Sequence, residues 1–172
     1  MTSGASFVGR AQDRATLAGM LGTTGLVTVV GPGGVGKTRL ALQVAFDVLD
    51  EFDDGAWLVE LAALADPASV PRAVASAMGI AEVPGKSTEE VLASALGSKA
   101  ALLILDNCEH LLDAVAGLAQ MLSERCPNLV ILSTSREPLD IDGEVVWRVE
   151  PLLTLDPDQT VGLADLKASD AV

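Results

Sequence analysis

The sequence has 172 residues, of which 49% are hydrophobic, and a formal net charge of −13. A chain of this size and composition can bury a single core of ordinary domain size, which excludes a disordered tail. The acidity argues against a surface for nucleic acid or for anionic membrane, because phosphate groups attract clustered Lys and Arg. With two Trp, three Phe and no Tyr, the chain also lacks the aromatic platforms on which single-strand binders stack bases.

The two cysteines, Cys108 and Cys126, stand without a CxxC or Cys/His spacing. We interpret both as small buried apolar residues, and the ligand count excludes a structural zinc site. Residues 1–6 lack the charged and apolar regions of a signal peptide, and no apolar run has the length of a membrane span. The sequence therefore predicts a cytoplasmic protein.

Short apolar runs alternate with segments of helical period, which is the pattern of an α/β domain with a mostly parallel sheet. Strands are predicted at residues 26–30, 56–61, 101–105, 129–133 and 145–149. Helices are predicted at residues 37–49, 66–79, 87–97 and from about 110 to 123. Ser87 followed by Glu90 predicts a capping box at the third helix. The pattern weakens after residue 152, so we expect one domain over 1–152, and a tail or the start of a missing lid or helical domain over 153–172.

Residues 31–38 match the phosphate-binding pattern G-x-x-x-x-G-K-[ST] in full, between a predicted strand and a predicted helix. Glycines let the backbone wrap around phosphates, and the following helix points its positive end at them. Lys37 is expected to reach the β- and γ-phosphates, and the Thr38 hydroxyl to coordinate Mg²⁺. We predict binding of ATP or ADP with Mg²⁺. The residues of this segment expected to bind the nucleotide are Gly31, Pro32, Gly33, Gly34, Val35, Gly36, Lys37, Thr38 and Arg39.

A second lysine, in Gly85-Lys86-Ser87, repeats only the end of this pattern. No strand leads into it, and the upstream glycine is displaced by one residue. Ser87 is better explained as a helix cap, so the segment is not interpreted as a second loop.

A hydrophobic strand over 102–105 delivers one carboxylate, Asp106, at its end. In P-loop proteins such an Asp holds Mg²⁺, so Thr38 and Asp106 are the predicted metal ligands. Many P-loop ATPases carry a second acid in the next position, but Asn107 cannot accept a proton. Glu109 could substitute for that acid. It could equally lie in the first turn of the next helix, where a carboxylate is favourable, and both interpretations stay open.

Arg136 follows Ser133-Thr134-Ser135 at the end of another predicted strand. If that strand lies between the phosphate-loop strand and the Asp106 strand, Arg136 can reach the γ-phosphate. The alternative is a surface arginine at a strand end.

Five segments occur in one order: Phe7-Val8-Gly9-Arg10, the phosphate-binding loop, and residues 102–110, 133–139 and 143–149. Together they resemble the nucleotide-binding domain of the STAND class of P-loop NTPases, which is related to the NB-ARC domains of apoptotic and plant immune switches. The resemblance is greatest to large bacterial transcriptional regulators of the LuxR and SARP types, and it covers the chain up to about Leu152.

The resemblance implies a three-layer α/β P-loop domain of the additional-strand, AAA-like type, with the strand order 2-3-4-1-5. It also implies that Val8, Gly9 and Arg10 lie against the adenine, mostly through their backbone. Arg136 would sense the γ-phosphate, and Lys37, Arg136 and Glu109 are the residues expected to act in hydrolysis. Guanine is disfavoured because the sequence has no N-K-x-D motif.

The predicted function is an ATP-dependent switch with slow hydrolysis, in a parent chain that adds helical, winged-helix, sensor and DNA-binding domains. The domain itself is expected to contact neither nucleic acid nor membrane, and an apolar surface left by missing neighbours could support self-association. The alternative is a stand-alone ATPase or small-molecule kinase. A kinase would need a mobile lid, and the only segment long enough, between Leu61 and Ala101, contains the single arginine Arg72.

Overall fold

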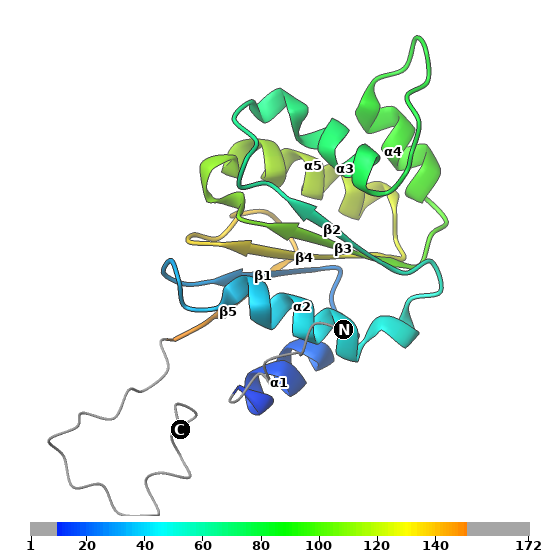
Figure 1. The fold of residues 1–172 in the computed structure, drawn as a ribbon. Coiled ribbons are helices and arrows are strands. Elements are labelled where there is room, and N and C mark those ends of the chain that lie inside the picture. The colour runs from blue at the N-terminus through cyan, green and yellow to red at the C-terminus, as the bar shows by residue number, and fades with distance from the viewer. Residues whose placement is uncertain (1–9, 151–172) are drawn as a thin grey trace, which may run out of the picture.

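The computed structural model describes residues 10–150, in which one five-stranded sheet lies between two layers of helices (Figure 1). The strands are β1 (Leu26–Val30), β2 (Ala56–Glu60), β3 (Ala101–Asp106), β4 (Leu129–Ser135) and β5 (Glu144–Arg148). The α-helices are α1 (Ala11–Leu21), α2 (Lys37–Asp47), α3 (Val70–Ala77), α4 (Thr88–Leu96) and α5 (Leu112–Arg125). Short 3₁₀ helices occupy Leu49–Glu51, Pro67–Ser69 and Cys108–His110.

The strand order in the sheet is β2-β3-β4-β1-β5, which confirms the predicted fold class and order. The four pairings between neighbouring strands are all parallel. Because β4 lies between β1 and β3, the segments that follow these three strands meet at one edge of the sheet. This is the edge to which the strand arrows point and at which the loop between β1 and α2 lies (Figure 1).

Each face of the sheet carries its own apolar core. Helices α3, α4 and α5 cover one face, and α1 and α2 cover the other (Figure 1). Strand β3 is buried at every position, with Leu103 and Leu105 in the first core and Leu102 and Ile104 in the second. Burial on both faces is typical of a parallel strand between helical layers, and it explains why this strand is a continuous hydrophobic run.

The predicted strands are all present, with ends displaced by at most two residues, but one helix was missed and three helix predictions need correction. The helix predicted at 66–79 is a 3₁₀ turn, Pro67–Ser69, followed by α3, which ends at Ala77. Helix α1 was not predicted, because only Leu17 and Leu21 of its residues are buried, and two positions give a weak helical period. Helix α2 ends at Asp47 and a 3₁₀ turn follows it, so the predicted continuation to residue 49 was wrong. Helix α5 begins only at Leu112, because a 3₁₀ turn follows Asn107, whose φ is 64°.

Two smaller predictions, on the helix cap and on the cysteines, are confirmed. Ser87 and Glu90 form the predicted capping box, in which the Glu90 N–H donates to Ser87 Oγ at 3.2 Å and the Ser87 N–H donates to Glu90 Oε2 at 2.9 Å. Cys108 and Cys126 are both free and buried. Within residues 10–150, no helix has the length and apolar character that crossing a bilayer requires.

Candidate nucleotide-binding site

The loop between β1 and α2 needs glycine for its backbone. Gly34 and Gly36 have φ angles of 77° and 92°, in the left-handed region that favours glycine. At Gly31 a Cβ atom would lie 2.9 Å from the carbonyl oxygen of Val149, closer than real Cβ atoms approach backbone. At Gly33 a Cβ atom would lie 3.4 Å from Arg136 Nη2. The loop therefore has the curled, side-chain-free form on which phosphate binding by backbone N–H groups depends.

Lys37 opens α2 and turns its ammonium group back into this loop. Lys37 Nζ donates to the carbonyl oxygens of Gly31 at 2.8 Å and Pro32 at 3.0 Å, and the residue is only 6% exposed. A cation is thus held inside the curl of the loop, where the negative charge of a polyphosphate would need it.

Thr38 and Asp106 meet as the sequence predicts. The Thr38 hydroxyl donates to Asp106 Oδ1 at 2.7 Å. The Thr134 hydroxyl donates to the same carboxylate oxygen at 2.5 Å, and it accepts the Asn107 N–H at 3.0 Å. The start of α2 and the ends of β3 and β4 therefore converge on one buried carboxylate.

This donor set fits Mg²⁺ bound together with a phosphate. The Thr38 hydroxyl can keep donating to Asp106 while its lone pairs coordinate a cation, and Mg²⁺ prefers oxygen ligands. In the part of the chain that the structure describes, no group of three or more His, Cys, Asp or Glu forms a potential metal site. Two protein oxygens, completed by phosphate oxygens and water, are the usual way in which proteins hold this ion.

Arg136 reaches the same loop from the end of β4. Its Nε lies 3.3 Å from Glu109 Oε1. Its Nη2 lies against Gly33, as the glycine geometry shows. Glu109 stands in the 3₁₀ turn before α5 and not in α5 itself. Its other oxygen, Oε2, is buried without a hydrogen-bond partner in the structure. The structure therefore brings Arg136 to the loop and pairs it with Glu109.

Arg10 contributes its side chain to the site's scaffold. The buried guanidinium donates from Nη2 to the carbonyl oxygens of Glu150 at 2.7 Å and Val35 at 3.3 Å. It also forms an ion pair with Asp13 at 3.1 Å. Arg10 thus ties the start of α1 to the phosphate loop and to the chain after β5. Its own contact with adenine stays a prediction.

Some of the predicted residues do not lie beside Lys37, Thr38 and Asp106 in the described structure. Val8 and Gly9 lie outside the described residues, so their contact with adenine stays a prediction. Arg39 lies on the exposed side of the first turn of α2, and Pro32 is exposed on the loop. Thr134, which the sequence did not single out, is the functional candidate that sequence reasoning missed. The signal was available in Ser133-Thr134-Ser135, three hydroxyls that end an apolar strand.

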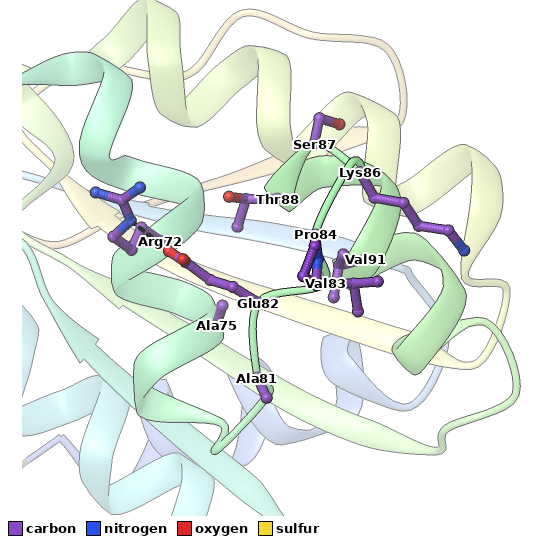
Figure 2. Close-up of a pocket in the computed structure, with 10 residues that line it drawn as sticks. All are labelled: Arg72, Ala75, Ala81, Glu82, Val83, Pro84, Lys86, Ser87, Thr88 and Val91. Carbon is purple, nitrogen blue, oxygen red and sulfur yellow. Dashed lines mark hydrogen bonds and ion pairs between the residues drawn. The ribbon is translucent and has the colours of Figure 1, made fainter.

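A pocket of about 440 Å³ lies away from this site, between α3 and α4 and beneath the loop of residues 81–86 (Figure 2). Arg72 lies at one side of the pocket and pairs with Glu82 at 2.8 Å, while the Lys86 side chain points outward (Figure 2). None of the residues predicted to bind nucleotide lines this pocket. The segment considered for a kinase lid instead contains α3 and α4, whose residues Val74 and Leu92 are buried in one apolar core with residues of the sheet.

A glycine loop between a buried strand and a helix, facing an aspartate on a strand two places away, is the arrangement of P-loop ATPases. The fold and the site thus define this chain as a P-loop ATPase domain. A family model described as "AAA domain" matches residues 20–139, and the chain belongs to that family.

Relatives of known sequence are longer proteins. The chain is 42% identical over 147 residues to an uncharacterized protein of Mycobacterium tuberculosis, covering 86% of this chain and 37% of that protein. It is 45% identical over 137 residues to a second protein of Mycobacterium tuberculosis, named "Putative HTH-type transcriptional regulator", covering 80% of this chain and 15% of that protein. The chain therefore spans well under half of the relatives that it matches.

Solved structures share the fold at low sequence identity. One is a Signal Transduction ATPase with Numerous Domains (STAND) protein with a tetratricopeptide repeat sensor from Pyrococcus horikoshii. It is 18% identical with a TM-score of 0.57, and the match covers 86% of this chain and 24% of that chain. Another is Cdc6p from Pyrobaculum aerophilum, 18% identical with a TM-score of 0.63, covering 86% of this chain and 48% of that chain.

Proposed function

We propose that this chain is an ATP-binding switch domain that requires Mg²⁺, hydrolyses ATP slowly and controls a larger signal-responsive transcriptional regulator. The observation that carries the proposal is the convergence of Thr38 and Asp106, 2.7 Å apart, beside the glycine loop. The hydroxyl, the carboxylate and the lysine ammonium lie together at one edge of the sheet, and this is the set of groups that binds a phosphate with Mg²⁺.

The contacts described above support the roles proposed for Lys37, Thr38 and Asp106, whereas the roles proposed for the adenine-binding residues and for Arg39 rest on the sequence alone. Lys37 exchanges its bonds to the Gly31 and Pro32 carbonyls for bonds to the β- and γ-phosphates, and the backbone N–H groups of residues 31–38 bind phosphate oxygens. Thr38 and Asp106 hold Mg²⁺, which neutralises phosphate charge when bound. Val8, Gly9 and Arg10 hold the adenine, Arg39 assists at the start of α2, and Arg136 contacts the γ-phosphate.

The acids near the loop support the proposal that hydrolysis is slow. During hydrolysis a water oxygen attacks the γ-phosphorus, the bond to the β–γ bridging oxygen breaks, and the water gives up a proton. Asn107, next to Asp106, cannot take that proton. Glu109 is the proposed acceptor, but its carboxylate already faces Arg136 at 3.3 Å. A base held in this way favours a long-lived ATP state, which suits a switch.

The regulatory context rests on the relatives. One relative is named as an HTH-type transcriptional regulator, and this chain matches only 15% of it. A structural neighbour is a STAND protein that carries a repeat sensor. We infer that the parent chain adds sensor, lid and DNA-binding domains, in the manner of LuxR- and SARP-type regulators with NB-ARC-like switches. In this proposal the domain works in the cytoplasm, contacts no nucleic acid or membrane itself, and self-associates in response to nucleotide.

The test is a calorimetric titration of the chain with ATP and ADP, with and without Mg²⁺, together with a turnover assay. The proposal expects Mg²⁺-dependent binding and turnover below about 1 s⁻¹, the lower end of ordinary enzymes. Asp106→Asn should remove most of the Mg²⁺ dependence, whereas Asp113→Asn, an exposed acid on α5, should leave it unchanged. Fast turnover would contradict the proposal. So would ATP binding by Asp106→Asn that depends on Mg²⁺ as strongly as binding by the wild type.

A further inference from the structure

One guanidinium group spans the distance between Glu109 and the phosphate loop. Arg136 Nε lies 3.3 Å from Glu109 Oε1, while its Nη2 lies 3.4 Å from the Cβ position of Gly33. Because Nε and Nη2 belong to the same edge of a guanidinium, this one edge of Arg136 lies against both the carboxylate and the loop. A guanidinium has five N–H donors in a rigid plane, so a carboxylate that holds Nε also fixes where Nη2 lies.

Of the two partners, Glu109 is the fixed one. Its side chain is 22% exposed, and Arg136 is 64% exposed. Glu109 follows the buried Cys108 in a short 3₁₀ turn, and Leu111, also buried, closes that turn with a 2.9 Å hydrogen bond to the Cys108 carbonyl. An exposed arginine on its own samples many rotamers, and holding it in one of them costs free energy that the carboxylate can offset.

The second carboxylate oxygen of Glu109 supports this view. Oε2 is buried and accepts no hydrogen bond in the structure. A cap of the 3₁₀ turn or of α5 would use that oxygen to accept backbone N–H groups. The interaction that the structure gives this carboxylate is its ion pair with Arg136.

We infer that Glu109, besides its proposed part in hydrolysis, positions Arg136 over Gly33, and that Glu109 thereby determines how strongly the site discriminates ATP from ADP. This inference rests on the proposed function, since it assigns Arg136 to the γ-phosphate. ADP has no γ-phosphate, so the position of Arg136 affects ATP affinity and leaves ADP affinity unchanged. The β-phosphate is served by the loop and Lys37 in both nucleotides.

The experiment measures the ratio of the ADP to the ATP dissociation constant for the 172-residue chain with Mg²⁺. Glu109→Leu removes both oxygens at similar volume and should lower this ratio about two- to tenfold, the usual cost of ordering one long side chain. Glu109→Gln, which keeps one acceptor, should fall between. In an Arg136→Gln background neither substitution should change the ratio, because no guanidinium remains to be positioned.

Glu137→Gln is the matched control, since it removes an exposed carboxylate next to Arg136 and should leave the ratio unchanged. Thermal unfolding shows which variants are folded. If Glu109→Leu is unfolded, the ratio of dissociation constants measured for Glu109→Gln tests the inference. An unchanged ratio overturns the inference, as does an equal rise in affinity for both nucleotides or a shift that persists without Arg136. A higher ratio would mean that Glu109 competes with the γ-phosphate, and it would overturn the inference as well. If the wild type binds no ATP, the proposed function fails first.

Discussion

Thr134 gives the sharpest test of how Asp106, the proposed metal ligand, is held. The Thr134 side chain is fully buried, and its hydroxyl makes two contacts. It donates to Asp106 Oδ1 at 2.5 Å and accepts the Asn107 N–H at 3.0 Å. Thr134→Val replaces the hydroxyl with a methyl group of similar size, so the change removes two hydrogen bonds and creates no cavity.

The expected loss of stability follows from those two bonds. A hydrogen bond to a charged group contributes about 1.5–3 kcal/mol, and a buried N–H left without a partner costs about 1–3 kcal/mol. Because the two effects share one hydroxyl they do not add fully, and we expect about 3 kcal/mol in total. With a urea dependence of about 2 kcal/mol per molar, the unfolding midpoint should fall by about 1.5 M.

Urea unfolding followed by tryptophan fluorescence measures this shift, and titration with ATP and Mg²⁺ measures the effect on binding. Thr134→Ser is the control, since it keeps the hydroxyl and loses one methyl group, which costs about 1 kcal/mol. We expect Thr134→Val to be the less stable of the two and to respond more weakly to Mg²⁺. Equal midpoints and equal Mg²⁺ responses in the two variants would refute the role given to this hydroxyl.

Three further outcomes follow from the structure. Gly31→Ala places a Cβ atom 2.9 Å from the Val149 carbonyl oxygen, so it should lower both the urea midpoint and the ATP affinity. Wild-type values for both would contradict this prediction. Gly117→Ala, in the exposed middle of α5 with nothing within 4 Å of the new methyl group, should raise stability by up to about 1 kcal/mol, and a fall in the urea midpoint would contradict this. Burial, with a smaller contribution from the charge of Asp106, raises the pKa of the Cys108 thiol to about 12. At pH 8 Cys108 should therefore resist thiol reagents in the folded chain and react in denaturant, and rapid labelling of the folded chain would count against its burial.

The sheet was predictable because its strands carry their own signal. Strands β1 and β3 are buried at every position, so each is an uninterrupted hydrophobic run in the sequence. Helix α1 gave no such signal, since only Leu17 and Leu21 of its residues are buried. The ends of α2 and α5 depend on local backbone turns, such as the positive φ of Asn107, which residue types indicate only weakly.

Some contacts of the candidate site could likewise be predicted from the sequence, and others could not. The approach of Thr38 to Asp106 follows from a motif of fixed spacing and from the order of the strands. The contacts of Thr134, Arg136 and Arg10 depend on tertiary structure, since Thr134 lies 28 residues from Asp106 and Arg10 lies 140 residues from Glu150. No motif in the sequence indicates these pairings. The sequence could name Glu109 and Arg136 separately, and only the fold joins them.

Binding of ATP at the loop of residues 31–38 is the central claim, and Lys37 tests it most directly. The measurement is a calorimetric titration with ATP, with and without Mg²⁺, of the wild type, Lys37→Ala and Lys86→Ala. Lys86 is the control because it is an exposed lysine in a segment that repeats only the end of the motif. We predict Mg²⁺-dependent binding that is kept in Lys86→Ala and lost in a folded Lys37→Ala variant. Equal ATP affinity in Lys37→Ala and the wild type, or no binding by the folded wild-type chain, would contradict the account.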